Sequence, residues 1–340
     1  MSIARPQPRL PVANRARGAV PGAGVSPATS GVPDAGGPAL EARIPLRFPL
    51  DVRSTLGPLR RGPGDPCVII DDSGVWLAFR TVAGPVTLLI TGSRTEVRLR
   101  AWGSGASEAL HQAPELLGLD DDWSELDTSA HELLASSAHR NPGLRLCRTG
   151  RVLDSLAPAI VEQKITSTEA FRAWRILVTR HGEAAPGPAP ERMRLPLLPE
   201  QWRRIPSWEW HRAGVDPRRS KTVIHAAVVA RSLERSTAAH AGGDTVWSLL
   251  RTVNGVGGWT AAETAQRSHG DPDAVSFGDY HLASWIGSAL VGEPVDDDGL
   301  AELLEPWAGQ RQRVVRLVLA SGFRPERHGP RMTIQDHRGH

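Results

Sequence analysis

The residues with the clearest chemical implication surround a glycine-rich turn. Residues 250–262 read LRTVNGVGGWTAA, with apolar residues at helical spacing before the glycines and small residues after them. Because glycine has no side chain and adopts positive φ, the backbone N–H groups of such a turn can approach an anion closely, and the N-terminus of the next helix adds partial positive charge. The pattern predicts two helices joined by a turn that binds a phosphate. A plain helix–helix turn is the alternative.

An aspartate follows this turn at the start of the next expected helix. Residues 277–281 read FGDYH, which places Asp279 24 residues after Gly255. A carboxylate at a helix N-terminus is stabilised as an anion. Aspartate is a common helix N-cap, and a chemical role for this carboxylate is compatible with capping.

Together these features resemble the helix–hairpin–helix DNA glycosylase superfamily. In that family the hairpin binds a DNA phosphate, often with a monovalent cation held by backbone carbonyls, and an aspartate follows a little over twenty residues later. Residues 160–167, IVEQKITS, resemble the family's preceding helix–turn–helix segment. The presence of a sheet domain before the helices resembles the DNA-3-methyladenine glycosylase II (alkylbase) type. The resemblance covers roughly residues 44–320.

The resemblance implies a role for several residues and partners. It makes Asp279 the catalytic residue, whose carboxylate could stabilise an oxocarbenium-like sugar or orient the water molecule that attacks it. It implies double-stranded DNA containing damaged bases as the partner, a monomeric protein, no membrane, and no cofactor other than the cation at the hairpin backbone; no metal is expected on side chains. The residues expected to bind DNA are Gly255, Gly257, Gly258, Thr260, Gln163 and Lys164.

The lysine and cysteine counts narrow the enzyme class. The chain has only two lysines, Lys164 and Lys221, whereas bifunctional members of the superfamily use a lysine just after the hairpin as a Schiff-base nucleophile. Trp259 stands at that position, so AP lyase activity is not expected. The only cysteines, Cys67 and Cys147, are too few for an iron–sulfur cluster held by four thiolates, for a four-cysteine zinc site or for a disulfide framework.

The resemblance also implies a pocket for a flipped base. Trp259, Tyr280 and Trp307 correspond to aromatic positions that hold a cationic base by stacking and cation–π contact in the alkylbase branch. Core packing is the alternative for each of them. Glu263 replaces an aromatic residue that the family often has there. It could attract a cationic base, accept a hydrogen bond from an exocyclic amine, or lie on the surface, and it puts the identity of the lesion in doubt.

Two residues precede a predicted helix in the turn where related enzymes insert a side chain into the DNA. Lys164 could fill the gap left by the flipped nucleotide with its stem while its ammonium group meets a phosphate, or it could be a solvated turn residue. Gln163 could contact the orphan base or cap the next helix. Thr166 and Glu169 form a capping-box pattern that opens this helix, and Gly182 ends it.

The chain divides into four segments by composition. Residues 1–39 predict a disordered basic tail rich in Pro and Gly. Residues 40–125 predict an α+β domain with an antiparallel sheet, and the alternation over 75–80 predicts one buried sheet face. Residues 126–320 predict an all-helical helix–hairpin–helix domain with a Pro-rich linker over 187–206. Residues 321–340 form a C-terminal tail.

Charge and hydropathy exclude some locations and leave the partner open. The 40 basic and 37 acidic residues give a net charge of only +3, although residues 151–235 are locally basic. No run of 18 apolar residues exists, and Pro and Gly interrupt the first residues, so neither a membrane span nor a signal peptide is expected. The protein is expected to be cytoplasmic.

The sequence therefore predicts a monofunctional base-excision repair glycosylase that flips and hydrolytically releases alkylated purines such as 3-methyladenine. One alternative is a glycosylase for deaminated or oxidised bases. The other is a non-catalytic helix–hairpin–helix protein that binds damaged DNA.

Overall fold

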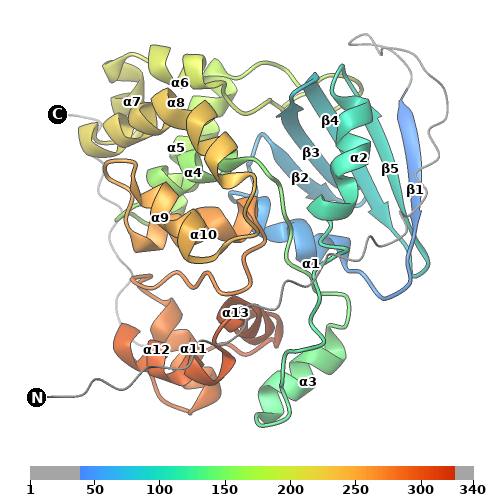
Figure 1. Ribbon diagram of the computed structural model, residues 1–340. Helices are drawn as coiled ribbons and strands as arrows, with labels where there is room; N and C mark the ends of the chain where they lie inside the picture. The colour runs from blue at the N-terminus through green and yellow to red at the C-terminus, as the bar shows by residue number, and fades with distance from the viewer. Residues whose placement is uncertain (1–38, 326–340) are drawn as a thin grey trace, which may run out of the picture.

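The computed structural model describes residues 39–325, in which an antiparallel sheet lies beside a helical body (Figure 1). Residues 1–38 and 326–340 lie outside the described part. The expected N-terminal tail and most of the expected C-terminal tail therefore fall outside it. No helix of residues 39–325 combines the length and the apolar character needed to cross a bilayer.

The sheet has five strands in the order β1-β5-β4-β3-β2, and every neighbouring pair is antiparallel. Strands β2 to β5 form a meander, and β1 pairs with β5 at the far edge. The strands are β1 (Leu40–Pro45), β2 (Val68–Asp71), β3 (Gly74–Thr81), β4 (Gly84–Gly92) and β5 (Glu96–Trp102). The expected antiparallel α+β arrangement is confirmed.

Both faces of the sheet are covered, which differs from the expected single buried face. Helices α1 (Val52–Leu56) and α2 (Ala106–Leu116) share a core with the alternate residues of β3 that begin at Val75. On the other face Trp76 is also buried and stacks on Trp102, with ring centroids 5.8 Å apart. Residues of the expected linker cover this face, and the Pro186 carbonyl accepts a hydrogen bond from Thr87 Oγ1 at 2.7 Å.

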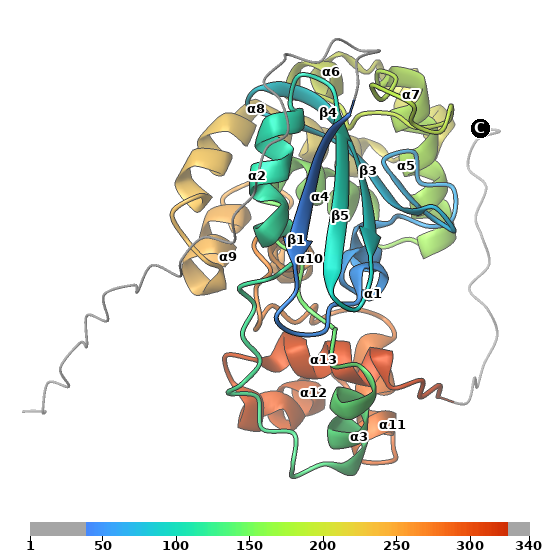
Figure 2. The same cartoon turned by 90° about the vertical axis from the view of Figure 1, so that its right-hand side faces the viewer.

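The rest of the described chain is helical (Figure 2). A 3-10 turn, η1 (Gly57–Leu59), follows α1, and another, η2 (Glu305–Trp307), follows α12. The helices after the sheet are α3 (Glu132–Arg140), α4 (Val152–Val161), α5 (Ser167–His181), α6 (Pro199–Arg204), α7 (Ser207–Ala213), α8 (Pro217–Thr237), α9 (Gly243–Arg251), α10 (Gly258–Ser268), α11 (Leu282–Leu290), α12 (Asp297–Leu304) and α13 (Arg311–Ala320).

Local signals fix the ends of α5. The Thr166 hydroxyl accepts the Glu169 N–H at 3.3 Å, and the Glu169 carboxylate accepts the Thr166 N–H at 3.0 Å, which is a complete capping box. The helix ends before Gly182, as the sequence predicts. Helix α6, in contrast, lies inside the stretch expected to be a linker.

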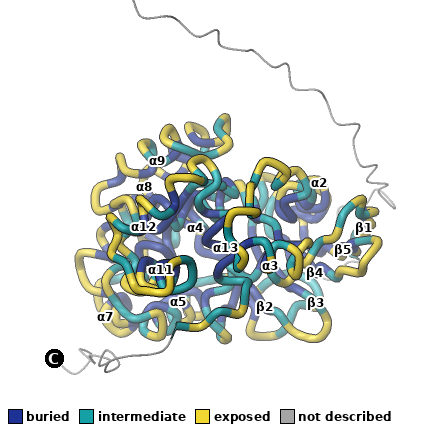
Figure 3. Tube along the Cα trace, turned by 90° about the horizontal axis from the view of Figure 1, so that it is seen from below, coloured by how far each residue is buried: buried dark blue, intermediate teal, exposed yellow. Residues whose placement is uncertain are grey.

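The apolar residues form two main cores. The larger one joins the sheet to α4, α5, α8, α9 and α10, and the smaller one joins α3 to α11, α12 and α13. Figures 1 and 2 both show α3 beside the three C-terminal helices, below the sheet. Figure 3 shows the buried residues in the middle of the trace and the exposed ones in the outer turns. The division of the chain at residues 125 and 320 stays a prediction.

Candidate active site

A cavity of about 330 Å³ is lined by residues that belong to both groups of helices. Its wall is built from five separate parts of the chain: α1 with the turn after it, the segment 145–147, α10, residues 276–285 and α13. This volume is in the range of sites that hold a small organic group. Asp279 and Glu263, two of the expected site residues, both line it.

Asp279 is held in front of α11 by the backbone of that helix. Its Oδ1 accepts the N–H groups of His281 and Leu282, each at 2.9 Å. Helix α11 begins at Leu282, three residues later than the sequence predicts. The aspartate thus satisfies N–H groups at the helix start, and these donors stabilise its negative charge. His281 occupies the N-cap position, so Asp279 contacts the helix start from two residues before it. The catalytic role of Asp279 stays a prediction.

The expected hairpin is present as α9, a turn and α10. Gly255 has φ +92°, and a Cβ there would lie 2.3 Å from Thr222 Oγ1 on α8, so the position requires glycine. Gly257 and Gly258 are exposed, and a Cβ on either would meet nothing within 4 Å. The first N–H groups of α10 have no partner in their own helix, so this open glycine pair can present them to an anion.

The turn before α5 is tied to this hairpin. The Gln163 side-chain amide donates to the Gly255 carbonyl at 3.0 Å and to Thr260 Oγ1 at 2.8 Å. Thr260 is only 2% exposed, so its hydroxyl points into this contact. Carbonyl oxygens of such a turn are the donor type that a monovalent cation takes. The cation, and the DNA contacts of these residues, stay predictions.

Lys164 has an unusual backbone conformation. Within residues 39–325 it is the only residue other than glycine with positive φ, at 56°, and its side chain is exposed. This conformation costs free energy for a residue with a Cβ, and such residues cluster at functional turns. The observation adds a reason to test the expected role of Lys164 in DNA.

The three aromatic residues expected in the base pocket do not line the cavity. Trp259 is partly buried on the first turn of α10. Tyr280 is 80% exposed, and its ring meets the His281 ring edge-on. Trp307 lies in η2 and donates its Nε1–H to the Asp127 carbonyl at 2.6 Å. Their role in holding a base stays a prediction.

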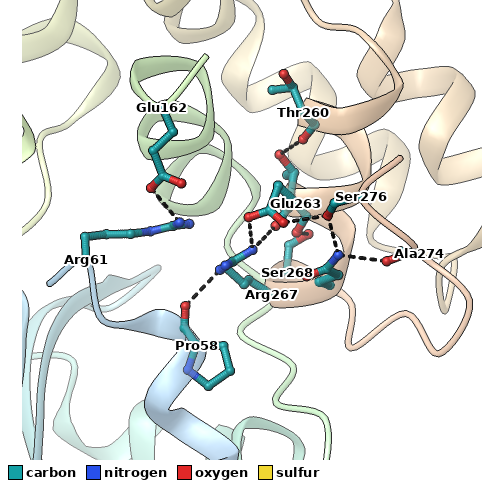
Figure 4. A network of polar contacts seen from close by, with 11 residues as sticks. Pro58, Arg61, Glu162, Thr260, Glu263, Arg267, Ser268, Ala274 and Ser276 are labelled. Carbon is teal, nitrogen blue, oxygen red and sulfur yellow. Dashed lines mark hydrogen bonds and ion pairs between the residues drawn. The ribbon is translucent and has the colours of Figure 1, made fainter. Parts of the chain in front are cut away.

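Glu263 is largely buried, with 13% of its side chain exposed, in a polar network at the cavity wall (Figure 4). Its carboxylate lies 2.8 Å from Arg267 Nη1 and accepts the Ser276 hydroxyl at 2.5 Å. Burial alone would raise the pKa of Glu263, but the Arg267 and Arg61 charges outweigh it and hold this pKa below its ordinary value. Glu263 is therefore an ionised side chain neutralised by Arg267. The alternative that it lies on the surface is wrong.

A second buried ion pair lies beside the first. Arg61, after η1, contacts Glu162 at 2.7 Å, and Arg267 also donates its Nε–H to the Pro58 carbonyl at 2.9 Å. Glu162 directly precedes Gln163, so the network joins the sheet side of the molecule to the turn that holds the hairpin (Figure 4). Burial raises the pKa of Glu162, which the Arg61 charge opposes.

Several polar side chains of the cavity wall were missed in the sequence analysis. Five buried polar atoms of cavity residues have no hydrogen-bond partner within residues 39–325; they are Thr55 Oγ1, Arg145 Nε, Trp285 Nε1, Gln312 Oε1 and Arg316 Nε. These residues follow no motif and are far apart in the chain. The sequence carries no local signal for them.

Comparison with solved structures identifies the fold of this chain. Neither a family model nor a curated protein sequence matches the chain. A solved 3-methyladenine DNA glycosylase from Archaeoglobus fulgidus is similar, with a TM-score of 0.68 and 18% identity over 82% of this chain and 97% of that one. An 8-oxoguanine glycosylase/lyase from Clostridium acetobutylicum in its apo form gives 0.64 and 11% identity over 88% and 98%.

The same Clostridium enzyme, in complex with double-stranded DNA containing cytosine opposite 8-oxoG, gives a TM-score of 0.59 and 13% identity over 82% of this chain and 94% of that one. The chain has the fold of helix–hairpin–helix DNA glycosylases, and the expected fold is confirmed. The similar structures include enzymes named for an alkylated base and for an oxidised base, so the fold leaves the base undecided.

Proposed function

We propose that this protein is a monofunctional DNA glycosylase that removes a damaged base from double-stranded DNA in base-excision repair. One observation carries the proposal: Asp279, held by two backbone N–H groups, lines a cavity that also borders α10, the helix that starts at the open glycine pair. The fold likeness to DNA glycosylases, one of them solved with double-stranded DNA, supports it.

The reaction follows from this arrangement. The N–H groups around Gly257 bind a backbone phosphate, and the damaged nucleotide rotates out of the duplex so that its base enters the cavity. The bond between C1′ and the base nitrogen breaks, and its electron pair leaves with the base. The Asp279 carboxylate stabilises the positive charge on the sugar and orients a water molecule. The water oxygen bonds to C1′ and releases a proton. A neutral purine leaves as an anion and takes up one proton, whereas a cationic alkylated purine leaves as a neutral base and the proton passes to solvent.

The absence of strand cleavage is part of the proposal. A Schiff base requires an amine close to C1′. No lysine lines the cavity in the described part of the chain, and Trp259 occupies the first turn of α10. Borohydride treatment of the protein with a duplex that it processes should trap no covalent complex. A trapped complex would contradict the monofunctional assignment.

Two classes of base are candidates. The sequence resemblance implies alkylated purines such as 3-methyladenine. Oxidised or deaminated bases are the second candidate, and the fold similarity to an 8-oxoguanine glycosylase/lyase supports them. A non-catalytic protein that binds damaged DNA is the remaining alternative, and the next experiment separates it from both.

The decisive experiment uses Asp279→Asn. The full-length protein and the variant are incubated with duplexes that each carry one lesion, and released bases are identified by mass spectrometry. We expect base release to fall by about 10²- to 10⁴-fold, because the carboxylate acts on charge that develops in the transition state. Affinity for a duplex with an abasic-site analogue should persist. Equal release by both proteins would overturn the catalytic role of Asp279, and binding without any release would support the non-catalytic alternative.

A further inference from the structure

We infer that Glu263 and Gln266 on α10 are positioning residues, which hold Ser276 and thereby fix the place of the Asp279 carboxylate at the cavity. The inference rests on the proposed function, in which Asp279 acts on the sugar. It goes beyond that function because it assigns a task to two side chains that act through another residue. It stands on the contacts of the segment between α10 and α11 and on the anchoring of Glu263.

The segment between α10 and α11 carries Asp279 and contains neither helix nor strand. A carboxylate on such a segment keeps its place only if other parts of the fold hold the backbone around it. The Asp279 N–H donates to the Ser276 carbonyl at 3.2 Å, so a short turn joins the two residues. A displacement of Ser276 is therefore passed on to Asp279.

Two side chains of α10 hold this turn (Figure 4). The Ser276 hydroxyl donates to Glu263 Oε1 at 2.5 Å and accepts from Gln266 Nε2 at 2.8 Å. Gln266 Nε2 also donates to the Ala274 carbonyl at 2.8 Å. Ser276 is only 4% exposed, so little water competes for these contacts. Because the hydroxyl both donates and accepts within the protein, its orientation is fixed.

The Glu263 carboxylate is itself anchored. Its Oε2 lies 2.8 Å from Arg267 Nη1 while its Oε1 accepts from Ser276, so each oxygen has its own partner. Arg267 also donates its Nε–H to the Pro58 carbonyl at 2.9 Å, which ties the pair to η1. The Arg267 and Arg61 charges hold the pKa of Glu263 below its ordinary value. The serine hydroxyl therefore donates to an ionised carboxylate, and such a hydrogen bond is stronger than one between neutral groups.

A contact from α12 holds the same turn from another side. The Gly278 N–H donates to Asp297 Oδ1 at 3.0 Å, and Gly278 has φ +87°, which glycine adopts without strain. The Asp279 carboxylate in turn accepts two N–H groups at the start of α11. Residues 276–279 are thus held from three helices. Such precision matters because a displacement of a catalytic group by about 1 Å can lower a rate by about 10²-fold.

Two variants remove the contact with Ser276 in different ways. Ser276→Ala removes the hydroxyl and leaves every charge in place, whereas Glu263→Gln removes the ionised acceptor. Base release is measured with the protein in excess over a lesion duplex, so that the rate reports the chemical step. Ser276→Ala should lower this rate by about 10-fold and Glu263→Gln by about 10- to 100-fold. Affinity for a duplex with an abasic-site analogue should stay within about twofold, since the hairpin is untouched.

Two matched controls lose a similar buried contact away from the cavity. Ser137 is fully buried, and its hydroxyl donates to the Leu317 carbonyl at 2.7 Å. Glu209 is 6% exposed and contacts Arg180 at 2.7 Å. Neither Ser137 nor Glu209 lines the cavity. Ser137→Ala and Glu209→Gln should lower the thermal unfolding temperature as the test variants do and leave the rate of base release unchanged.

Two further measurements separate positioning from a loss of stability. Hydrogen exchange of residues 276–282, measured by mass spectrometry without DNA, should be faster in Ser276→Ala and Glu263→Gln and unchanged in the controls. The double variant should lose less rate than the product of the two single losses, because both changes remove the same contact. Thermal unfolding establishes that each variant is folded. If Glu263→Gln does not fold, Gln266→Leu takes its place, because it removes the other contact with the serine hydroxyl.

Each outcome decides the inference. Slower base release at unchanged affinity, together with faster exchange of residues 276–282, supports it. Release by Ser276→Ala at the wild-type rate, or a loss no larger than that of Ser137→Ala, overturns it while the proposed glycosylase activity stands. If the wild-type protein releases no base from any duplex, the proposed function fails and hydrogen exchange alone decides. Faster exchange in the test variants and in neither control then supports positioning by α10, and unchanged exchange overturns it.

Discussion

The hairpin and the cavity offer different chemical groups to a ligand. The hairpin presents backbone N–H groups at Gly257 and Gly258, where no side chain lies within 4 Å of an added Cβ. The cavity presents side chains from five parts of the chain, among them the buried pair of Glu263 and Arg267. A contact through backbone suits the phosphate that every nucleotide shares, whereas a contact through side chains can differ between bases.

This difference predicts which positions should tolerate a substitution without loss of stability. The open side of the hairpin has no packing to disturb, so a change there alters binding and leaves stability nearly constant. The cavity wall is also part of the interior, so a change there alters stability as well as recognition. The following predictions test this contrast, beginning with the largest expected effect.

Arg267→Met should cause the largest loss of stability. The change leaves Glu263 buried without its nearest cation and removes the donor to the Pro58 carbonyl. We expect the free energy of unfolding in urea to fall by about 3–5 kcal/mol. Arg98→Met breaks an exposed ion pair with Glu96 and should cost under about 1 kcal/mol. Equal losses would mean that the buried network does not stabilise the cavity wall.

Two alanine substitutions separate the two sides of the hairpin. Gly255→Ala forces a Cβ into a conformation with φ +92° and against Thr222, so it should cost about 2 kcal/mol or more. Gly257→Ala has φ −96° and open space, so its stability should change by under about 1 kcal/mol. Its affinity for a duplex with an abasic-site analogue should nevertheless fall about tenfold, because the methyl group obstructs the phosphate. Similar stability losses for both variants would contradict the contrast.

The pH dependence of stability should report the Glu263 charge. Because the pKa of Glu263 is lowered in the folded protein, its stabilising contribution is present above the unfolded pKa and is lost as pH falls through the folded pKa. The difference in unfolding free energy between the wild type and Glu263→Gln should therefore be largest near pH 7 and should narrow below pH 4.5, the ordinary pKa of a glutamate. This narrowing should be smaller than the loss of stability caused by Arg267→Met. Chemical unfolding at pH 7 and pH 3.5 measures it. A difference that widens in acid would rule out this account.

Lys164→Gly should show the smallest effect on stability. Glycine accepts the φ of 56° without strain but adds conformational entropy to the unfolded chain, so the net change should be under about 1 kcal/mol. If Lys164 contacts a phosphate, affinity for the abasic-site duplex should fall, and the slope of log affinity against log salt concentration should decrease by about 1. Arg94→Ala, in the turn between β4 and β5, is the control. An unchanged slope in Lys164→Gly would leave this lysine without a role in DNA binding.

Features encoded by neighbouring residues were predictable from the sequence. The capping box of Thr166 and Glu169, the hairpin around Gly255 and the position of Asp279 shortly before a helix each depend on fewer than about thirty residues of context. The antiparallel sheet was equally predictable, because apolar runs alternate with turns.

Features that depend on distant parts of the chain were not predictable. The second covered face of the sheet requires a Pro-rich segment that lies about a hundred residues beyond Trp76. The cavity brings Thr55 next to Arg316, and no spacing rule connects them. The pocket expected from Trp259 and Tyr280 rested on resemblance alone, and the structure directs neither residue into the cavity. A binding site formed by backbone groups can be recognised from a sequence motif. A site formed by side chains from distant segments can be recognised only when the fold is known.

The contact between Gln163 and the hairpin has a mechanical consequence. One side-chain amide joins the turn that carries Lys164 to the Gly255 carbonyl and to Thr260, at 3.0 and 2.8 Å. The spacing between these two turns is therefore set before any duplex arrives. Under the proposed function, a stiff template of this kind obliges the double helix to supply the deformation, so an easily bent step in the duplex is bound at a lower elastic cost than an intact one.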